Sequence, residues 1–304
     1  MIYTVTFSPA IDYVVYLDKL DMGAMNRTIR EDHFFGGKGI NVSTILTELG
    51  IENTAMGFVS GFTGEALEKG LREKGVKTDF VHLERGITRI NVKIKTDCET
   101  EINSQGAAIS REKLQELLEK LDVLQEGDFL IISGNVPNTL PEDIYEIMIK
   151  RLEGKDISCV VDATGQLLKN VLKYRPFLIK PNKKELEELL DITIKTDDDL
   201  EAGAKKLQDM GARNVLISLG KDGAYLLCEN GDNHYMKAAG QGAVNTVGAG
   251  DSMVAGFIAG YLHKGDFEEA LRSGIAAGSA TACSEGLATG ESIREFYKTI
   301  KERG

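Results

Sequence analysis

Residues Asn245 to Asp251 read N-T-V-G-A-G-D, and the apolar run Ser252–Leu262 follows directly. A turn of small residues that opens onto a buried helix leaves the first backbone N–H groups of that helix without intrahelical acceptors. These amides form an anion site, and the positive helix end favours the ionised form of the Asp251 carboxylate. Taken alone, the stretch is more typical of a tight turn with an aspartate cap. Whether it is an anion site therefore depends on the rest of the sequence.

Composition and charge exclude several classes of protein. The chain has 304 residues, of which 42% are hydrophobic and 27% charged, as is ordinary for a soluble globular protein. A net charge of −11 argues against binding to a nucleic-acid backbone or to an anionic membrane surface. No run approaches the ~20 apolar residues that span a membrane.

The N-terminus and the cysteines indicate a cytoplasmic location. Met1–Phe7 is strand-like from the start and no basic segment precedes it, so we expect no signal peptide. The four cysteines are scattered without a C-x-x-C pair, and Cys159 and Cys228 lie in apolar runs. We therefore expect buried free thiols in a reducing compartment and no zinc site.

Short apolar segments alternate with segments of helical period along most of the chain, which predicts an α/β fold with a mostly parallel central sheet flanked by helices. The expected strands are Met1–Phe7, Thr54–Val59, Phe129–Ser133, Ile157–Asp162, Phe177–Lys180 and Val215–Ser218, followed by an antiparallel pair, Gly223–Cys228 and His234–Ala238. The expected helices include Val42–Leu49, Ser110–Leu121, Pro141–Leu152, Lys183–Leu190, Asp198–Met210, Ser252–Leu262, Phe267–Ser284 and Ser292–Lys301.

Two segments do not fit the alternation of strands and helices. Tyr13–Phe35 and Thr88–Thr96 alternate at period two, and Glu99–Asn103 continues the second segment as a hairpin. They predict a small sheet that stands off the main body as a lid or a dimer surface. We therefore expect one domain over residues 1–304, with lid strands at approximately 12–35 and 87–104 inserted in it.

Polar residues follow the predicted strands at one edge of the sheet, where ligands of open α/β sheets bind. They are Asp12, Gly134-Asn135, Asp162, Asn182 with Glu185, and Gly220. Each alone is more typical of a cap or turn. Five such positions on one edge predict a ligand site.

Other segments carry signals that are weak individually and become more informative in combination. Gly36–Asn41 (G-G-K-G-I-N) lacks Walker spacing, yet a glycine cluster with a lysine at a helix start suits a hydroxyl-bearing or anionic ligand. Arg89 could hold a phosphate with two N–H groups, although a solvated arginine is the ordinary interpretation. Asn182-x-x-Glu185 could hold a hydrated Mg²⁺ or merely start a helix. Ser218–Gly223 could border a nucleotide or form only a hairpin.

Together, these motifs resemble those of the ribokinase-like carbohydrate kinases, the PfkB family. Gly36–Asn41 is similar to the N-terminal signature of that family, Asn245–Asp251 to its C-terminal signature, and Lys180–Glu185 (K-P-N-K-K-E) to its magnesium region. The resemblance covers nearly the whole chain. It implies a three-layer α/β core with a β-sheet lid, ATP as phosphoryl donor with Mg²⁺, and a sugar or sugar phosphate as acceptor.

The resemblance also implies roles for individual residues. Asp251 would be the base, and the amides of Gly248, Ala249 and Gly250 would stabilise the moving phosphoryl group. The acceptor would be bound by Asp12, Gly37, Lys38, Asn41, Arg89 and Asn103. ATP would be bound by Lys180, Ser218, Gly220, Gly223, Thr246, Gly248 and Gly250. The metal ligands would be Asn182 and Glu185.

Several stretches look most like the bacterial branch of the family that phosphorylates fructose 1-phosphate, with tagatose 6-phosphate as the alternative acceptor. Two departures bear on which sugar is used: Ser133-Gly134-Asn135 replaces the usual Ser-Gly-Ser, and Ser104 stands where glycine is usual. A homodimer through the lid is also expected.

Two other classes of function are weaker. A non-catalytic sugar-phosphate sensor would have no use for a base at Asp251. A dinucleotide-binding oxidoreductase would need a G-x-G-x-x-G motif in the first βα unit, and the chain has none there.

Overall fold

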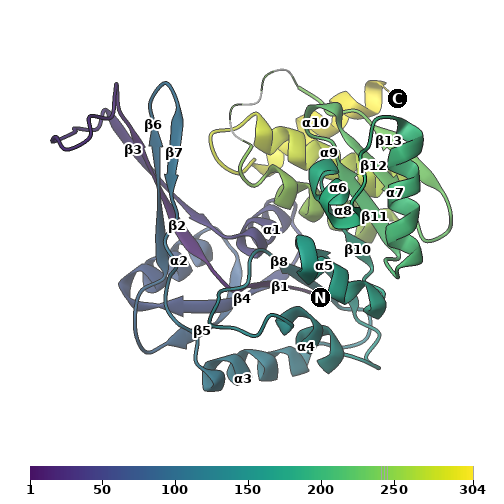
Figure 1. Ribbon diagram of the computed structural model, residues 1–304, viewed down its shortest axis with the longest axis horizontal. Coiled ribbons are helices and arrows are strands. Elements are labelled where there is room, and N and C mark those ends of the chain that lie inside the picture. Colours follow the sequence, from purple (N-terminus) through teal and green to yellow (C-terminus); the bar gives the residue numbers. More distant parts are fainter. Residues whose placement is uncertain (241, 243, 245, 304) are drawn as a thin grey trace.

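The computed structural model describes residues 1–240, 242, 244 and 246–303, and this part of the chain forms two sheets. A nine-stranded sheet makes the main body, and a four-stranded sheet stands away from it on one side (Figure 1). The predicted α/β architecture, a large mostly parallel sheet between helices with a small separate lid sheet, is confirmed.

The large sheet has the strand order β13-β12-β11-β10-β9-β8-β1-β4-β5. Its strands are parallel except at one edge, where β12 pairs antiparallel with both β11 and β13. The bounds are β1 Ile2–Thr6, β4 Asn53–Ser60, β5 Lys77–Leu83, β8 Phe129–Ser133, β9 Ser158–Asp162, β10 Leu178–Ile179, β11 Asn214–Ser218, β12 Ala224–Leu227 and β13 Asn233–Met236.

Helices cover both faces of this sheet. One face carries α1 (Lys38–Glu48), α8 (Ala249–Lys264), α9 (Phe267–Ala282) and α10 (Gly290–Arg303). The other carries α3 (Arg111–Lys120), α4 (Ile144–Arg151), α5 (Gly165–Val171), α6 (Lys183–Leu190) and α7 (Asp197–Asp209). A smaller apolar cluster packs α2 (Gly61–Glu73) over the β4–β5 edge.

Successive residues of the central strands serve the two faces in turn. Ile131 packs in the apolar cluster under α8 and α9, whereas Ile132 packs in the cluster under α3 to α7. Leu216 and Ile217 divide in the same way, and all four side chains are fully buried. Because side chains alternate across a strand, a sheet covered on both faces needs unbroken apolar runs.

The lid sheet has the order β3-β2-β6-β7, with bounds β2 Ala10–Tyr16, β3 Arg30–Gly36, β6 Arg89–Lys95 and β7 Glu99–Ile102. Thr88 fixes its base to the main sheet. The Thr88 N–H donates to the Ser60 carbonyl at 2.8 Å, and the Ser60 N–H donates to the Thr88 hydroxyl at 2.9 Å. Strand β6 therefore leaves the body from an anchored residue.

Three features differ from the sequence-based expectation. Strand β5 was not predicted, because only Phe80 and Val81 of its residues are buried and the segment reads as polar. Asp12 lies inside lid strand β2 rather than directly after the first strand of the main sheet. Helix α8 starts at Ala249, three residues before the predicted Ser252, so its first turn contains Gly250 and Asp251.

Candidate active site

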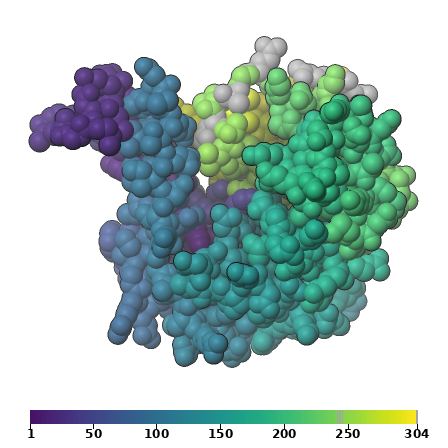
Figure 2. Space-filling model, viewed as in Figure 1, coloured from purple at the N-terminus to yellow at the C-terminus, as the bar shows by residue number. Residues whose placement is uncertain are grey.

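One cavity of about 640 Å³ is lined by every residue that the sequence predicts for the acceptor, the nucleotide, the metal and the transferred group. Its walls come from both the lid and the main body, and Figure 2 shows a hollow between the lid strands and the C-terminal part of the chain. Asn245, which belongs to the C-terminal motif, lies outside the described residues. The roles of these side chains remain predictions, and their geometry follows.

The start of α8 is built from small residues. Gly248 caps the helix in the left-handed region (φ 79°), a conformation that favours glycine, and a Cβ there would also lie 2.7 Å from a Leu287 methyl carbon. The Ser252 hydroxyl donates to the Gly248 carbonyl at 2.8 Å. The first-turn amides of an α-helix have no intrahelical acceptor, so this end of α8 is able to bind an anion.

Asp251 is a buried carboxylate in that first turn, 6% exposed. Its Oδ2 accepts a hydrogen bond from Asn41 Nδ2 at 2.7 Å. Burial, and then the charge of Asp162, raises the pKa of Asp251 to about 6. Burial therefore opposes the preference of the helix end for the ionised carboxylate.

Asp162 links two lysines at the floor of the cavity. Lys38 Nζ lies 3.3 Å from Asp162 Oδ2, and Lys180 Nζ lies 3.4 Å from Oδ1. The Asp162 side chain is 3% exposed and that of Lys180 is 7% exposed. Burial alone would raise the pKa of Asp162, but the two ammonium groups hold it below its ordinary value.

The lid contributes a row of polar side chains. Arg89, Asn91 and Lys93 lie at alternate positions of β6 and all line the cavity. Asn91 Nδ2 donates to Asp12 Oδ1 at 2.7 Å, which orients the Asp12 carboxylate across the β2–β6 pair. Asn103, an exposed residue just after β7, donates to Glu101 at 3.4 Å.

The sequence does not predict Asn91 and Lys93 as site residues. The period-two pattern around Arg89 carries the signal for both, because alternate residues of a strand share a face. Asp162 is among the polar residues that the sequence predicts at the sheet edge, but the sequence predicts no role for it.

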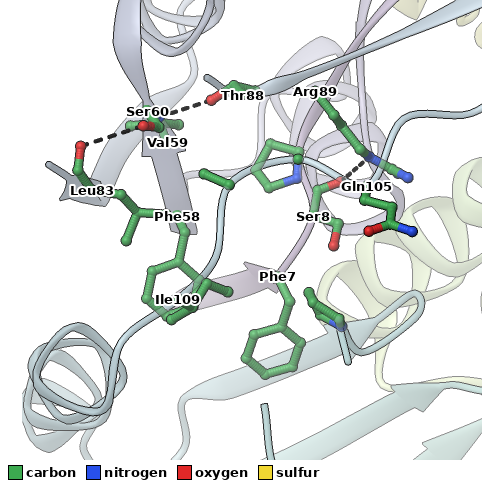
Figure 3. A pocket seen from close by; sticks show the side chains of 14 residues that line it. Phe7, Ser8, Phe58, Val59, Ser60, Leu83, Thr88, Arg89, Gln105 and Ile109 are labelled. Atoms are coloured by element: carbon green, nitrogen blue, oxygen red, sulfur yellow. Dashed lines mark hydrogen bonds between the residues drawn. The ribbon is translucent and has the colours of Figure 1, made fainter. Parts of the chain in front are cut away.

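Arg89 stands at the base of the lid between two cavities. Its Nε donates to the Ser8 carbonyl at 3.2 Å, as Figure 3 shows beside Gln105. Burial lowers the pKa of Arg89, and Asp12 partly opposes that shift. Arg89 and Lys38 both line a second cavity of about 300 Å³, whose wall also includes Ser133 and Asn135.

The opposite end of the main cavity carries the residues predicted to bind a nucleotide. Ser218 ends β11, and Gly220 begins the short 3₁₀ helix η3 (Gly220–Asp222). Gly223 follows at φ 105°, and a Cβ there would lie 2.0 Å from the Met236 carbonyl oxygen, which excludes other residues. Thr246 is exposed on the approach to α8.

Asn182 and Glu185 form a capping box at the start of α6. Asn182 Oδ1 accepts from the Glu185 N–H at 2.9 Å, and Glu185 Oε2 accepts from the Asn182 N–H at 2.8 Å. Oε1 of Glu185 is not part of this pair. Among the described residues, no group of three or more His, Cys, Asp and Glu side chains could hold a metal ion. The pair therefore fits a cation bound mainly by water and phosphate oxygens rather than a protein-enclosed metal.

A mostly parallel sheet, a lid, and a cavity that combines a helix N-terminus with a buried carboxylate and lysines are typical of small-molecule kinases. Residues 3–294 match the pfkB family of carbohydrate kinases. The chain belongs to this family and is a carbohydrate kinase.

Individual relatives agree with this assignment. The chain is 42% identical over 301 residues to the 1-phosphofructokinase of Bacillus subtilis (strain 168), with 99% of each chain covered. It is 40% identical over 289 residues to a D-tagatose-1-phosphate kinase of Bacillus licheniformis, with 94% of each covered. Phosphofructokinase-2 from Escherichia coli, solved in complex with substrates and products, superposes with a TM-score of 0.93 at 28% identity, with 99% of each chain covered.

Proposed function

We propose that the protein transfers the γ-phosphoryl group of ATP to the 6-hydroxyl of fructose 1-phosphate, giving fructose 1,6-bisphosphate and ADP. The observation that carries the proposal is the pair of cations, Lys38 and Arg89, on the wall shared by the main cavity and the 300 Å³ cavity. Two cations away from the nucleotide end suit an acceptor that already bears a phosphate. The full-length similarity to a 1-phosphofructokinase supports the same acceptor.

The side chains support the following chemistry. Asp251 accepts the proton of the sugar hydroxyl while the oxygen of that hydroxyl bonds to the γ-phosphorus of ATP. The bond from this phosphorus to the bridging oxygen breaks, which releases ADP. Asn41 holds the Asp251 carboxylate in place. The first-turn amides at Gly248–Gly250 stabilise charge on the moving group.

ATP and Mg²⁺ are the proposed cofactors. We assign ATP to Lys180, Ser218, Gly220, Gly223, Thr246 and the start of α8, and Mg²⁺ to Asn182 and Glu185 together with ATP oxygens. When bound, Mg²⁺ neutralises charge on the phosphates during transfer.

A tagatose phosphate is the second candidate acceptor, favoured by the 40% identity to a D-tagatose-1-phosphate kinase. That similarity directs attention to tagatose 1-phosphate beside the predicted tagatose 6-phosphate. Fructose and tagatose differ at one hydroxyl-bearing carbon, so the contacts to that hydroxyl decide between them.

Three further points belong to this proposal. The whole chain acts as one kinase unit, closed by the lid segments 12–35 and 87–104. It works in the cytoplasm, where ATP is available and free thiols persist. It forms a homodimer through the lid. None of the described helices is both long and apolar enough to cross a membrane.

A coupled assay of ADP release tests the acceptor. The panel is fructose 1-phosphate, fructose 6-phosphate, tagatose 1-phosphate and tagatose 6-phosphate, with ATP and Mg²⁺, and Asp251→Asn is the inactive control. The highest kcat/KM is expected with fructose 1-phosphate. A higher value with either tagatose phosphate would reassign the acceptor, and binding without turnover on every sugar would favour a sensor.

A further inference from the structure

Asp162 is placed between the two ends of the cavity. It closes β9 in the middle of the large sheet, and each of its carboxylate oxygens contacts one lysine. Lys38 belongs to the start of α1 and lines both cavities at the acceptor end. Lys180 follows β10 and lines the main cavity but not the 300 Å³ cavity.

Lys180 reaches the start of α8. A Cβ added to Gly250 would lie only 3.1 Å from Lys180 Nζ, so the ammonium group lies beside the helix turn that carries Asp251. A lysine side chain is long and flexible, and a single carboxylate restricts two of them here. The burial of Lys180 makes this pairing necessary, because an unpaired buried charge is strongly destabilising.

We propose that Asp162 is a positioning residue that holds Lys38 toward the acceptor phosphate and Lys180 toward the transferred phosphoryl group as one rigid unit. The proposal rests on the proposed function, in which the cavity holds a phosphorylated acceptor and ATP at the same time. Asp162 then fixes the spacing of the two cations that bind them. It does not contact the reacting atoms itself.

The charge of Asp162 also acts on the proposed base. The charged groups that influence Asp251 are Asp162, Lys38 and Lys180, from β9, α1 and the end of β10, and Asn41 supplies a neutral hydrogen bond. Other charged residues line the same cavity: Asp12, Arg89, Lys93, Glu101, Glu185 and Lys221. Removing the negative charge of Asp162 leaves the two lysines unopposed, so the pKa of Asp251 should fall.

The test is Asp162→Asn, which keeps the shape of the side chain and removes its charge. We expect KM to rise roughly tenfold for both ATP and the sugar phosphate, the order of one lost charge-assisted hydrogen bond each. We also expect the acid limb of kcat/KM to move to lower pH by about one unit, because the two lysines then lower the pKa of Asp251 without an opposing charge. Loosening of the fold would also hydrate Asp251 and lower its pKa, so the melting temperature of Asp162→Asn and a charge-conserving variant are needed to separate the two causes.

Two further variants separate charge from structure. Asp162→Glu keeps the charge, so its acid limb stays where it is in the unmodified enzyme even if KM changes. Asp128→Asn also removes the charge of a buried, ion-paired aspartate, which lies directly before β8, but its partner is the N-terminal amine, and it should alter only thermal stability.

An unchanged acid limb together with unchanged KM values in Asp162→Asn would overturn the proposal. So would a KM increase confined to one substrate, because the two lysines would then not act as one unit. If the unmodified enzyme turned over no sugar phosphate, the proposed function would fail instead, and the two failures are therefore distinguishable.

Discussion

Two effects of opposite sign act on the pKa of Asp251. The N-terminal end of α8 favours the carboxylate, whereas burial and the nearby Asp162 favour the neutral acid, and the net result is a raised pKa. A carboxylate with a pKa of about 6 is a stronger base than an exposed aspartate and is still ionised at neutral pH. Both properties suit proton removal from a sugar hydroxyl.

The pH dependence of activity follows from that raised pKa. The base must be deprotonated, so kcat/KM is full above the pKa and is lost as the pH falls through about 6. The measurement is the pH profile of kcat/KM with saturating ATP. An acid limb near pH 4, the range of an exposed aspartate, would show that the pKa of the proposed base is not raised in the working enzyme.

Arg89 provides a second test at the residue scale. Arg89→Met keeps much of the length of the side chain and removes the guanidinium, so the acceptor should lose a charge-assisted contact of about 1.5–3 kcal/mol. We expect KM for the sugar phosphate to rise roughly 10- to 100-fold while KM for ATP stays nearly constant.

The matched control for Arg89 is Arg151→Met. Arg151 is ion-paired with Asp122 on the surface, and Asp122 is exposed. This change should leave both KM values unaltered. Equal effects of Arg89→Met on the two substrates would remove Arg89 from the acceptor end.

At the scale of elements, α8 combines a functional start with a tightly packed body. Its N-terminal turn faces the cavity, whereas Gly256 faces α9, where an added Cβ would lie 2.4 Å from the Ser273 carbonyl oxygen. The two glycines therefore have different roles. Gly250 leaves room for the Lys180 ammonium group, and Gly256 lets α8 and α9 approach closely.

Substitution of each glycine by alanine should separate these two effects. Gly256→Ala should lower the free energy of unfolding by about 1–3 kcal/mol or more, because a buried backbone oxygen has to move. Gly250→Ala should lower kcat with little change in Tm, because only the end of a lysine side chain has to move. Thermal denaturation and steady-state kinetics on both variants check this, and the reverse pattern would contradict the division.

At the scale of the whole molecule, two of the contacts that hold the lid lie far apart on it. Its base is fixed through Thr88, and farther out the Arg30 guanidinium on β3 contacts the Glu285 carboxylate at 2.6 and 3.2 Å. Beyond these contacts, the β2–β3 connection exposes Leu20, Met22, Met25 and Ile29, with Met22 at 87% and Met25 at 82%. Exposed apolar side chains gathered in one segment are typical of an interaction surface.

We expect these lid residues to form the homodimer contact. Met22→Asp combined with Met25→Asp should convert the dimer to a monomer, because four buried carboxylates at a symmetric interface would be unpaired. Sedimentation equilibrium measures the mass. Val123→Asp, an exposed apolar residue of η1 (Leu121–Val123), is the control and should leave the mass unchanged. A monomeric unmodified protein would contradict the lid dimer.

The sequence by itself determined the α/β class, the order of most elements, the lid segments and the family. These depend on local patterns: unbroken apolar runs bounded by turn residues, helical periodicity, and glycine motifs that only particular backbone conformations satisfy. It missed β5, whose polar residues lie at a sheet edge, and it placed the start of α8 one turn late, because Gly248 and Gly250 on either side of Ala249 are poor helix formers.

Only the tertiary structure decided which charged groups meet. The Lys38–Asp162–Lys180 cluster joins residues far apart in the chain, and no local pattern records a distance between them. The same holds for the pKa of Asp251, since burial is a property of the packed molecule and not of the motif. Residues Asn245 to Asp251 thus predict where phosphoryl transfer takes place, and the packing around Asp251 raises the pKa of its carboxylate.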